Sequence, residues 1–222
     1  FRFCPRCARP LARRGLRDDG GAVIERLACA DAGCGFVHWG NPTPAVGALV
    51  EHDGEIVLAR GQGWPEGWFA LVTGYLEARE DPLAAVAREV REELGLETVA
   101  ASLIGNYIFE KKNEVMLCYH VVATGRVRLG EEIAEIRGQK PADLRPWRRA
   151  TGLAVADWMR SRGLPFEFAE QVGEIVVADL ERVVVEQVVD PHKEVGKGMQ
   201  PGEPGIALQQ IQEHLDRSYG AD

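Results

Sequence analysis

Between Gly74 and Leu96 the chain reads GYLEAREDPLAAVAREVREELGL, and its second half carries the signs of an α-helix. Asp81 is a favourable N-cap residue, and Pro82 suits the first helical position, where a missing N–H costs nothing. Gly95 can adopt the left-handed conformation that ends a helix after Leu94. At about 3.6 residues per turn, the apolar stripe expected to face the core comprises Leu83, Val86, Ala87, Val90 and Leu94.

Three glutamates crowd a neighbouring face of this helix: Glu89, Glu92 and Glu93. Like charges spaced four residues apart repel one another, at a cost of about 0.2–0.5 kcal/mol per pair. A hard divalent cation reverses that repulsion, because carboxylate oxygens are its preferred ligands and Mg²⁺ needs few of them beside substrate phosphates. Arg88 could hold the Glu89 carboxylate in place. A solvated acidic face is the alternative that the glutamates alone leave open.

Further residues stand at fixed distances around the glutamates. Five residues separate Gly74 from Glu80, seven more precede Arg88-Glu89-Val90, and Glu92-Glu93 and Gly95-Leu96 follow. This arrangement matches the signature of the Nudix hydrolases at every fixed position. The chain therefore resembles that family.

The resemblance implies an α/β fold, an α/β/α sandwich with a mixed sheet. It also implies an enzyme that uses Mg²⁺ or Mn²⁺ to hydrolyse a nucleoside diphosphate linked to another group. It implies a metal held by three side chains and one backbone carbonyl: Glu89, Glu92, Glu93 and Gly74. Arg88 would orient Glu89, one glutamate would help to activate water, and Glu80 would have a supporting role. Metal chemistry agrees with this, since the diphosphate is negative and the protein has a net charge of -8.

Residues 1–40 are predicted to form a zinc ribbon. They contain four of the five cysteines, as the close pairs Cys4/Cys7 and Cys29/Cys34. Two such pairs roughly twenty residues apart have the spacing at which four thiolates hold one Zn²⁺. The metal would replace a core that so short a segment cannot build.

Alternatives stay open for this segment. Two disulfides are possible, but no secretory signal is recognised. A redox Cys-x-x-Cys lacks a surrounding βαβ pattern. His38 could replace one zinc ligand. The arginines of the segment could attract nucleic acid or keep a small module soluble; they are Arg2, Arg6, Arg9, Arg13, Arg14, Arg17 and Arg26.

Residues 41–168 are predicted to form the Nudix domain. Asn41-Pro42-Thr43-Pro44 should be an extended junction, and Asp53-Gly54 is a hairpin signal. Cys118 is expected to be a buried core thiol. The predicted elements are strands at 45–51 and 55–60, a loop at 61–67, a strand at 68–73, the helix at 82–94, strands at 98–109 and 113–123, and a helix at 151–162.

Some pocket residues are expected outside the helix. The segment 130–135 resembles the one from which many family members supply another carboxylate, so Glu132 or Glu135 could be a further metal ligand; a solvated loop is the alternative. Aromatic residues that could stack on a base are Trp64, Trp68, Tyr107 and Phe109. Core packing is the alternative for each of them.

A zinc ribbon ahead of such a domain resembles two Nudix branches, the NADH pyrophosphatases and the plant FAD/ADP-ribose pyrophosphatases. The first carries Ser-Gln-Pro-Trp soon after the helix, whereas residues 105–110 here read GNYIFE. The resemblance thus implies cleavage of a dinucleotide or an ADP-ribose-like compound into two monophosphates, without fixing the substrate. The alternatives are a non-catalytic module that binds a nucleotide and acts through a partner, and a nucleoside triphosphate hydrolase. The intact set of glutamates favours catalysis.

The remaining predictions concern partners and location. The net charge of -8 argues against broad binding to nucleic acid or anionic lipid. No apolar run is long enough to span a bilayer, so a cytoplasmic location is expected. Residues 169–222 form a C-terminal extension of unknown role, with a valine-rich run at 174–189, a linker at 191–205 and helical spacing at 206–219. The valine-rich run could add a strand or pair with a second subunit. We expect the last helix to support a homodimer; a partly ordered tail is the alternative.

Overall fold

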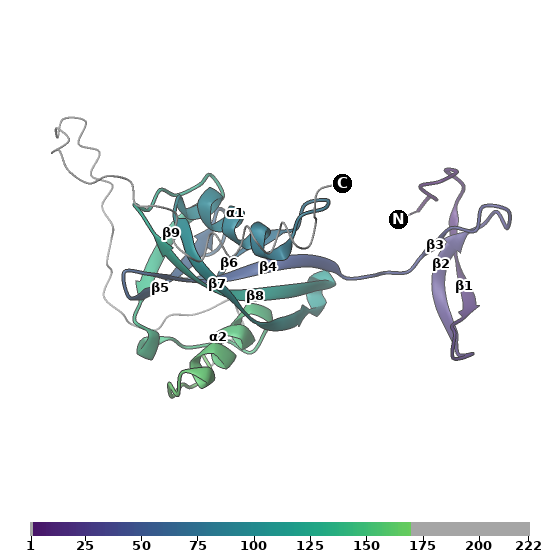
Figure 1. The fold of residues 1–222 in the computed structure, drawn as a ribbon. Helices are drawn as coiled ribbons and strands as arrows, with labels where there is room; N and C mark the ends of the chain where they lie inside the picture. Colours follow the sequence, from purple (N-terminus) through teal and green to yellow (C-terminus); the bar gives the residue numbers. More distant parts are fainter. Residues whose placement is uncertain (1, 170–222) are drawn as a thin grey trace, which may run out of the picture. The chain divides into compact units, whose positions relative to one another are not determined.

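The computed structural model describes residues 2–169. The chain divides into two compact units, one ending at Pro42 and the other beginning at Thr43 (Figure 1). The valine-rich run, linker and helix expected at 174–219, and with them the predicted dimer element, lie outside the described residues.

The first unit is a small antiparallel sheet. It comprises β1 (Leu11–Arg17), β2 (Val23–Cys29) and β3 (Val37–His38), in the order β1-β2-β3. Asp18 closes the β1–β2 turn, where its Oδ1 accepts the Ala22 N–H at 2.8 Å. The buried apolar side chains of the unit are few: Cys4, Ala28 and Cys29. Such a small apolar core stabilises little by itself.

The second unit is built on a mixed six-stranded sheet. Its strands are β4 (Thr43–His52), β5 (Glu55–Gly61), β6 (Val72–Tyr75), β7 (Glu97–Phe109), β8 (Glu114–Thr124) and β9 (Ile133–Gln139). The order is β7-β8-β4-β5-β9, and β6 pairs with the first half of β4. β4 and β8 are parallel, whereas the other pairs are antiparallel. The helices are α1 (Pro82–Leu94), α2 (Ala150–Ser161) and the short 3-10 turns Glu110–Lys112 and Pro141–Asp143.

The two α-helices cover opposite faces of this sheet (Figure 1). Along β4, Val46, Ala48 and Val50 belong to the apolar cluster that includes Val86 and Val90 of α1. The intervening Leu49 belongs to the cluster that includes Val155 and Trp158 of α2. This alternation follows from the period of two along a strand and makes the predicted α/β/α sandwich. Cys118 is fully buried, as predicted.

The helix α1 has the expected ends. The Asp81 carboxylate accepts the Leu83 N–H at 2.8 Å, and Gly95 is left-handed with φ 66°. The buried side differs slightly from the predicted stripe, because Ala85 is buried in place of Ala87 and Glu93 is buried with it.

Two strand predictions were incomplete. The strand expected at 68–73 begins only at Val72, although Ala70 makes one isolated bridge to Ala59. Phe69, Ala70 and Leu71 are all buried, so this segment does not show the alternation of a strand with one solvated face. The strand β9 was not predicted, because charged residues interrupt the apolar positions of this edge strand.

Neither α1 nor α2, the two α-helices of the described part, is long and apolar enough to cross a membrane.

Candidate active site

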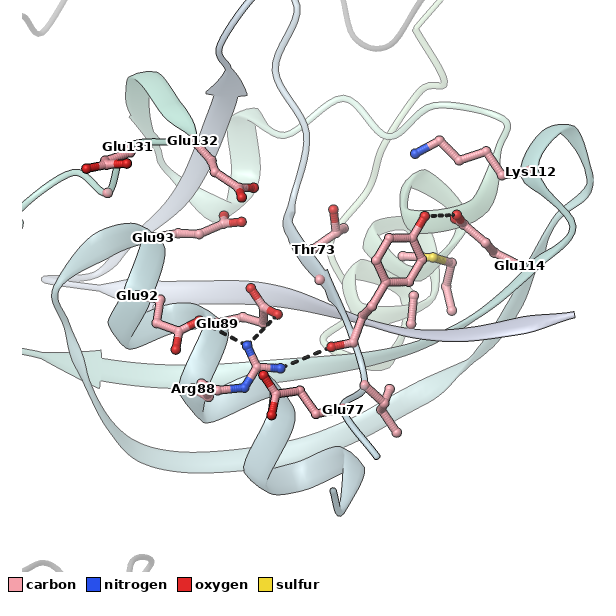
Figure 2. A pocket seen from close by; sticks show the side chains of 16 residues that line it. Thr73, Glu77, Arg88, Glu89, Glu92, Glu93, Lys112, Glu114, Glu131 and Glu132 are labelled. Carbon is pink, nitrogen blue, oxygen red and sulfur yellow. Dashed lines mark hydrogen bonds and ion pairs between the residues drawn. The ribbon is translucent and has the colours of Figure 1, made fainter. Parts of the chain in front are cut away.

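A cavity of about 650 Å³ lies beside α1 (Figure 2). Two cationic side chains, Arg88 and Lys112, line it. Its carboxylates are far more numerous: Glu77, Glu89, Glu92, Glu93, Glu114, Glu131 and Glu132. A cavity with this balance of charge favours cations over anions.

Arg88 holds the carboxylates of the helix by using all of its donors. Its Nε and Nη2 donate to the two oxygens of Glu80 at 2.7 and 2.9 Å. Its Nη1 donates to Glu89 at 2.8 Å and to Glu92 at 3.0 Å, and Nη2 also donates to the Tyr75 carbonyl at 3.0 Å. A guanidinium has five N–H groups, so no further donor is left for a substrate. Arg88 therefore fixes the positions of the Glu80, Glu89 and Glu92 carboxylates in the structure. Its hydrogen bonds lower the pKa of Glu80.

Glu93 has no such cation. The residue is 8 % exposed, and within residues 2–169 we find no ion pair or hydrogen bond to its carboxylate. Burial, followed by the negative charges of Glu89, Glu132 and Glu92, raises its pKa to about 8. Burial also raises the pKa of Glu89, against the opposing effect of Arg88. Hard oxygen donors that outnumber the nearby positive charges fit a divalent cation such as Mg²⁺ or Mn²⁺.

Gly74 is required by its contact with Glu89. It lies on β6 opposite Val46 of β4. A Cβ atom at this position would stand 1.9 Å from both Cδ and Oε1 of Glu89. Only glycine lets the backbone and this carboxylate approach so closely. The sequence placed Gly74 near the metal by resemblance, and the structure supplies a steric reason for the glycine.

The chain after β8 is fixed to the C-terminal end of α1. The Arg128 N–H donates to the Leu94 carbonyl at 2.8 Å, and the Gly130 N–H donates to the Glu93 carbonyl at 2.9 Å. These bonds satisfy carbonyls that a helix end otherwise leaves unpaired. They bring the next residues, Glu131 and Glu132, to the cavity (Figure 2).

Of the two acids proposed as a further ligand, Glu132 faces the α1 carboxylates. Glu135 instead lies on β9, where it pairs with Arg60 at 3.1 Å and with Arg137 at 3.8 Å. It lines neither this cavity nor the one beside it. The geometry therefore favours Glu132.

Comparison with known proteins shows the family of this chain. The family model described as the NUDIX domain matches residues 41–158. The chain belongs to the Nudix family. Its fold is also similar to that of a NUDIX hydrolase from Nitrosomonas europaea, with a TM-score of 0.56, 22% identity, and coverage of 76% of this chain and 97% of that one.

Among curated proteins, the Nudix chain is similar to enzymes named NAD-capped RNA hydrolase NudC. It is 32% identical over 139 residues to the protein of Stutzerimonas stutzeri (strain A1501). The aligned residues cover 61% of this chain and 47% of that protein. It is 41% identical over 81 residues to that of Mycobacterium bovis (strain BCG / Pasteur 1173P2), 36% of this chain and 26% of that protein. The chain thus spans half or less of the length of these relatives.

The aromatic candidates of the Nudix domain separate into two groups. Trp64 lines a second cavity, of about 490 Å³, that adjoins the first. Tyr107 donates to Asp157 of α2 at 2.8 Å, and both Tyr107 and Phe109 pack against the apolar cluster on the α2 face. Like Trp68, they line neither cavity. The geometry therefore does not support Trp68, Tyr107 and Phe109 as the base-stacking residues, and packing accounts for Tyr107 and Phe109.

Several lining residues had no signal in the sequence. Tyr75 follows Gly74 on β6, and its hydroxyl donates to Glu114 of β8 at 2.5 Å. Ala45 of β4 lies between the two strands, opposite both Tyr75 and Met116. Lys112, from the turn before β8, lines the same wall (Figure 2). Only the pairing of β4 with β6 and β8 brings them together, so no local spacing could have revealed them.

In the first unit, the four predicted cysteines form one group. The Sγ–Sγ distances are 3.7 Å for Cys4–Cys34 and 3.5 Å for Cys7–Cys29, and all four Sγ atoms lie within 4.8 Å of one another. A tetrahedral Zn²⁺ with Zn–S bonds of about 2.3 Å would separate its sulfurs by about 3.8 Å. All four thiols are free, so the disulfide alternative is wrong. His38 is not a member of this group.

Proposed function

We propose that the chain hydrolyses the diphosphate of a dinucleotide or ADP-ribose-like compound, releasing two monophosphates. The observation that carries this proposal is the buried Glu93 carboxylate, which no cation of residues 2–169 pairs with and which lies beside the Arg88-held Glu89 and Glu92. A module that only binds nucleotides has no need for three neighbouring carboxylates that repel one another.

The residues that would hold Mg²⁺ or Mn²⁺ are Glu89, Glu92 and Glu93, with Glu132 and the Gly74 carbonyl as further ligands. When bound, the ion would neutralise the phosphate charge and lower the pKa of bound water. Arg88 keeps Glu89 and Glu92 in place during the reaction. The water oxygen forms a bond to one phosphorus, its proton passes to a glutamate carboxylate, and the bond from that phosphorus to the bridging oxygen breaks.

The relatives named NAD-capped RNA hydrolase extend the set of candidate substrates to NAD and NAD-capped RNA. An RNA substrate would differ from our expectation, based on the net charge, that nucleic acid is not a partner. The stretch at 105–110 lacks the Ser-Gln-Pro-Trp of the NADH pyrophosphatases, so NADH is not favoured over ADP-ribose. The shared feature of these compounds is a diphosphate that joins two nucleoside or sugar arms.

The test is a product assay with Mg²⁺ and, separately, Mn²⁺. NADH, FAD, ADP-ribose, a dinucleoside polyphosphate, a nucleoside triphosphate and an NAD-capped RNA are each incubated with the protein, and products are separated by chromatography. We expect two monophosphates from at least one diphosphate-linked compound. Absence of any turnover across the panel would refute the proposal. Cleavage of the nucleoside triphosphate alone would show that the substrate is a triphosphate and not a diphosphate-linked compound.

For the first unit, we infer that the four thiolates hold one structural Zn²⁺. A cytoplasmic location and a homodimer also remain predictions. Light scattering tests the dimer element predicted from residues 206–219. It would be excluded if a chain ending at Phe168 had the same number of subunits as the full chain.

The Gly74→Ala variant should be nearly inactive although folded. The new methyl group would stand within 2 Å of the Glu89 carboxyl group and displace it, and displacing a catalytic group typically costs about 100-fold in kcat/KM. Steady-state kinetics with the best substrate and circular dichroism measure the two properties. Gly20→Ala is the matched control, because its Cβ meets only the Asp18 Oδ1 at 3.4 Å. Wild-type kinetics for Gly74→Ala would contradict the close approach.

A further inference from the structure

The second cavity continues the first. The two share four lining residues, Thr73, Glu93, Glu131 and Glu132, so they meet at the carboxylate group. Beyond this shared wall, the second cavity is lined by Trp64 and Gln62 together with small and aliphatic residues. We call this second cavity the Trp64 lobe. The site thus extends to two sides of the metal-binding carboxylates.

The charge of the Trp64 lobe disfavours an anionic group. Among residues 2–169, the only charged residues that line it are the three shared glutamates. The nearby Arg60 is engaged, since its Nε pairs with Glu135 at 3.1 Å. An anionic phosphate would find no cationic side chain in the lining, whereas an uncharged aromatic ring would lose little by leaving water.

Trp64 is held in place as part of the wall. Its indole lies against Gly61, where a Cβ would stand 3.0 Å from Cε2 of the ring. Its side chain packs against the apolar cluster of the α2 face, and its carbonyl accepts a hydrogen bond from Arg60 at 3.4 Å. A ring that is already immobilised offers a stacking surface at little cost in conformational entropy.

The segment that carries Trp64 is also tied to Glu132. The Gln62 N–H donates to the Glu132 carbonyl at 2.7 Å, and the Gln62 side-chain amide donates to the Ile133 carbonyl at 3.3 Å. These two bonds fix the spacing between the indole and the carboxylate group. A ligand can therefore contact both at once only if its ring and its phosphate are joined at a matching distance.

We propose that the Trp64 lobe binds the nucleobase of the substrate, stacked on the indole, while the phosphates lie at the carboxylate group. The other arm of the substrate then occupies the cavity lined by Tyr75 and Lys112. This assignment rests on the proposed function in taking the ligand to be a nucleotide. Of the four aromatic candidates from the sequence it selects Trp64, and not Trp68, Tyr107 or Phe109. Stacking of one base on an aromatic side chain changes affinity by roughly 5- to 150-fold.

The experiment measures binding, independently of turnover. The full chain is titrated calorimetrically with AMP and with ribose 5-phosphate in the presence of Mg²⁺, because the two ligands share the phosphate and the sugar but only AMP has a base. We expect Trp64→Leu to weaken AMP binding by about tenfold or more and to change ribose 5-phosphate binding by less than about twofold. Trp64→Phe should retain AMP affinity within about threefold, since it keeps an aromatic face.

Trp68→Leu is the matched control, because Trp68 follows closely in the same segment and lines neither cavity. AMP affinity should stay at the wild-type value in this variant. The proposal is overturned if Trp64→Leu leaves AMP binding unchanged, if it weakens both ligands equally, or if the wild type binds AMP no better than ribose 5-phosphate. Preferential AMP binding without turnover of any substrate would leave this assignment standing and refute the proposed hydrolysis instead.

Discussion

Glu93→Gln should lower kcat by on the order of a thousandfold, since it removes one negative ligand and a candidate proton acceptor from the group that the reaction needs. The substitution keeps the size of the side chain, so the packing around α1 should be preserved. Steady-state kinetics with Mg²⁺ measure the loss. Glu97→Gln is the matched control, because Glu97 is exposed and lines neither cavity. Retention of most of the activity by Glu93→Gln would refute the assignment of this site.

The same variant should be more stable than the wild type when Mg²⁺ and Mn²⁺ are removed. The pKa of Glu93 is raised to about 8 in the folded protein, whereas an unfolded glutamate titrates near about 4.3. The folded state thus binds the proton more tightly, and this stabilisation is full at low pH and is lost as the pH rises from about 4.3 to about 8. Glutamine carries no charge and does not lose stability in that range.

Urea unfolding at pH 5 and pH 8 tests this sign, in protein dialysed free of Mg²⁺ and Mn²⁺ but retaining zinc. At pH 8 the free energy of unfolding of the second unit should be about 2–4 kcal/mol higher in Glu93→Gln than in the wild type. The difference should shrink at pH 5, and saturating Mg²⁺ should reduce it at pH 8 by stabilising the wild type. A constant difference across the pH range would show that burial of the charge is not its cause.

Loss of the zinc that we propose at the cysteine group should unfold residues 2–42 and leave the Nudix domain folded. Among the described residues of the first unit, the buried apolar side chains are limited to Cys4, Ala28 and Cys29. Binding of structural zinc to such sites contributes about 10–16 kcal/mol, more than so small a core can replace. In Cys29→Ser, two-dimensional NMR should show the resonances of the first unit collapsing to unfolded positions while those of the Nudix domain stay dispersed.

Cys118→Ala is the control for cysteine substitution, because this thiol is buried in the Nudix domain and not in the group of four. Its first-unit resonances should stay dispersed. Elemental analysis of gently purified wild-type protein should give about one zinc per chain. Well under one zinc per chain, or a folded first unit in Cys29→Ser, would contradict the structural role of the metal.

The elements that the sequence predicted well are those encoded by near neighbours. Asp81 and Gly95 specify the ends of α1 through hydrogen bonds to residues within about one helical turn, and Pro82 suits its first position. The Asp53-Gly54 turn likewise defines the hairpin of β4 and β5. Strand β9 and the late start of β6 were missed, because their positions depend on partners far along the chain, β5 and β4.

The same division holds for the candidate site. By itself the sequence determined the family, the three glutamates of α1 with Arg88 beside them, and the four cysteines, because each depends on spacing along a short segment. Only the tertiary structure decided that Glu93 is buried without a cation, that Glu132 and not Glu135 faces it, and that Trp64 lines the adjoining lobe. Burial and approach across strands depend on how β4 pairs with β6 and β8 and on how the chain returns to the end of α1, and no local pattern encodes those contacts.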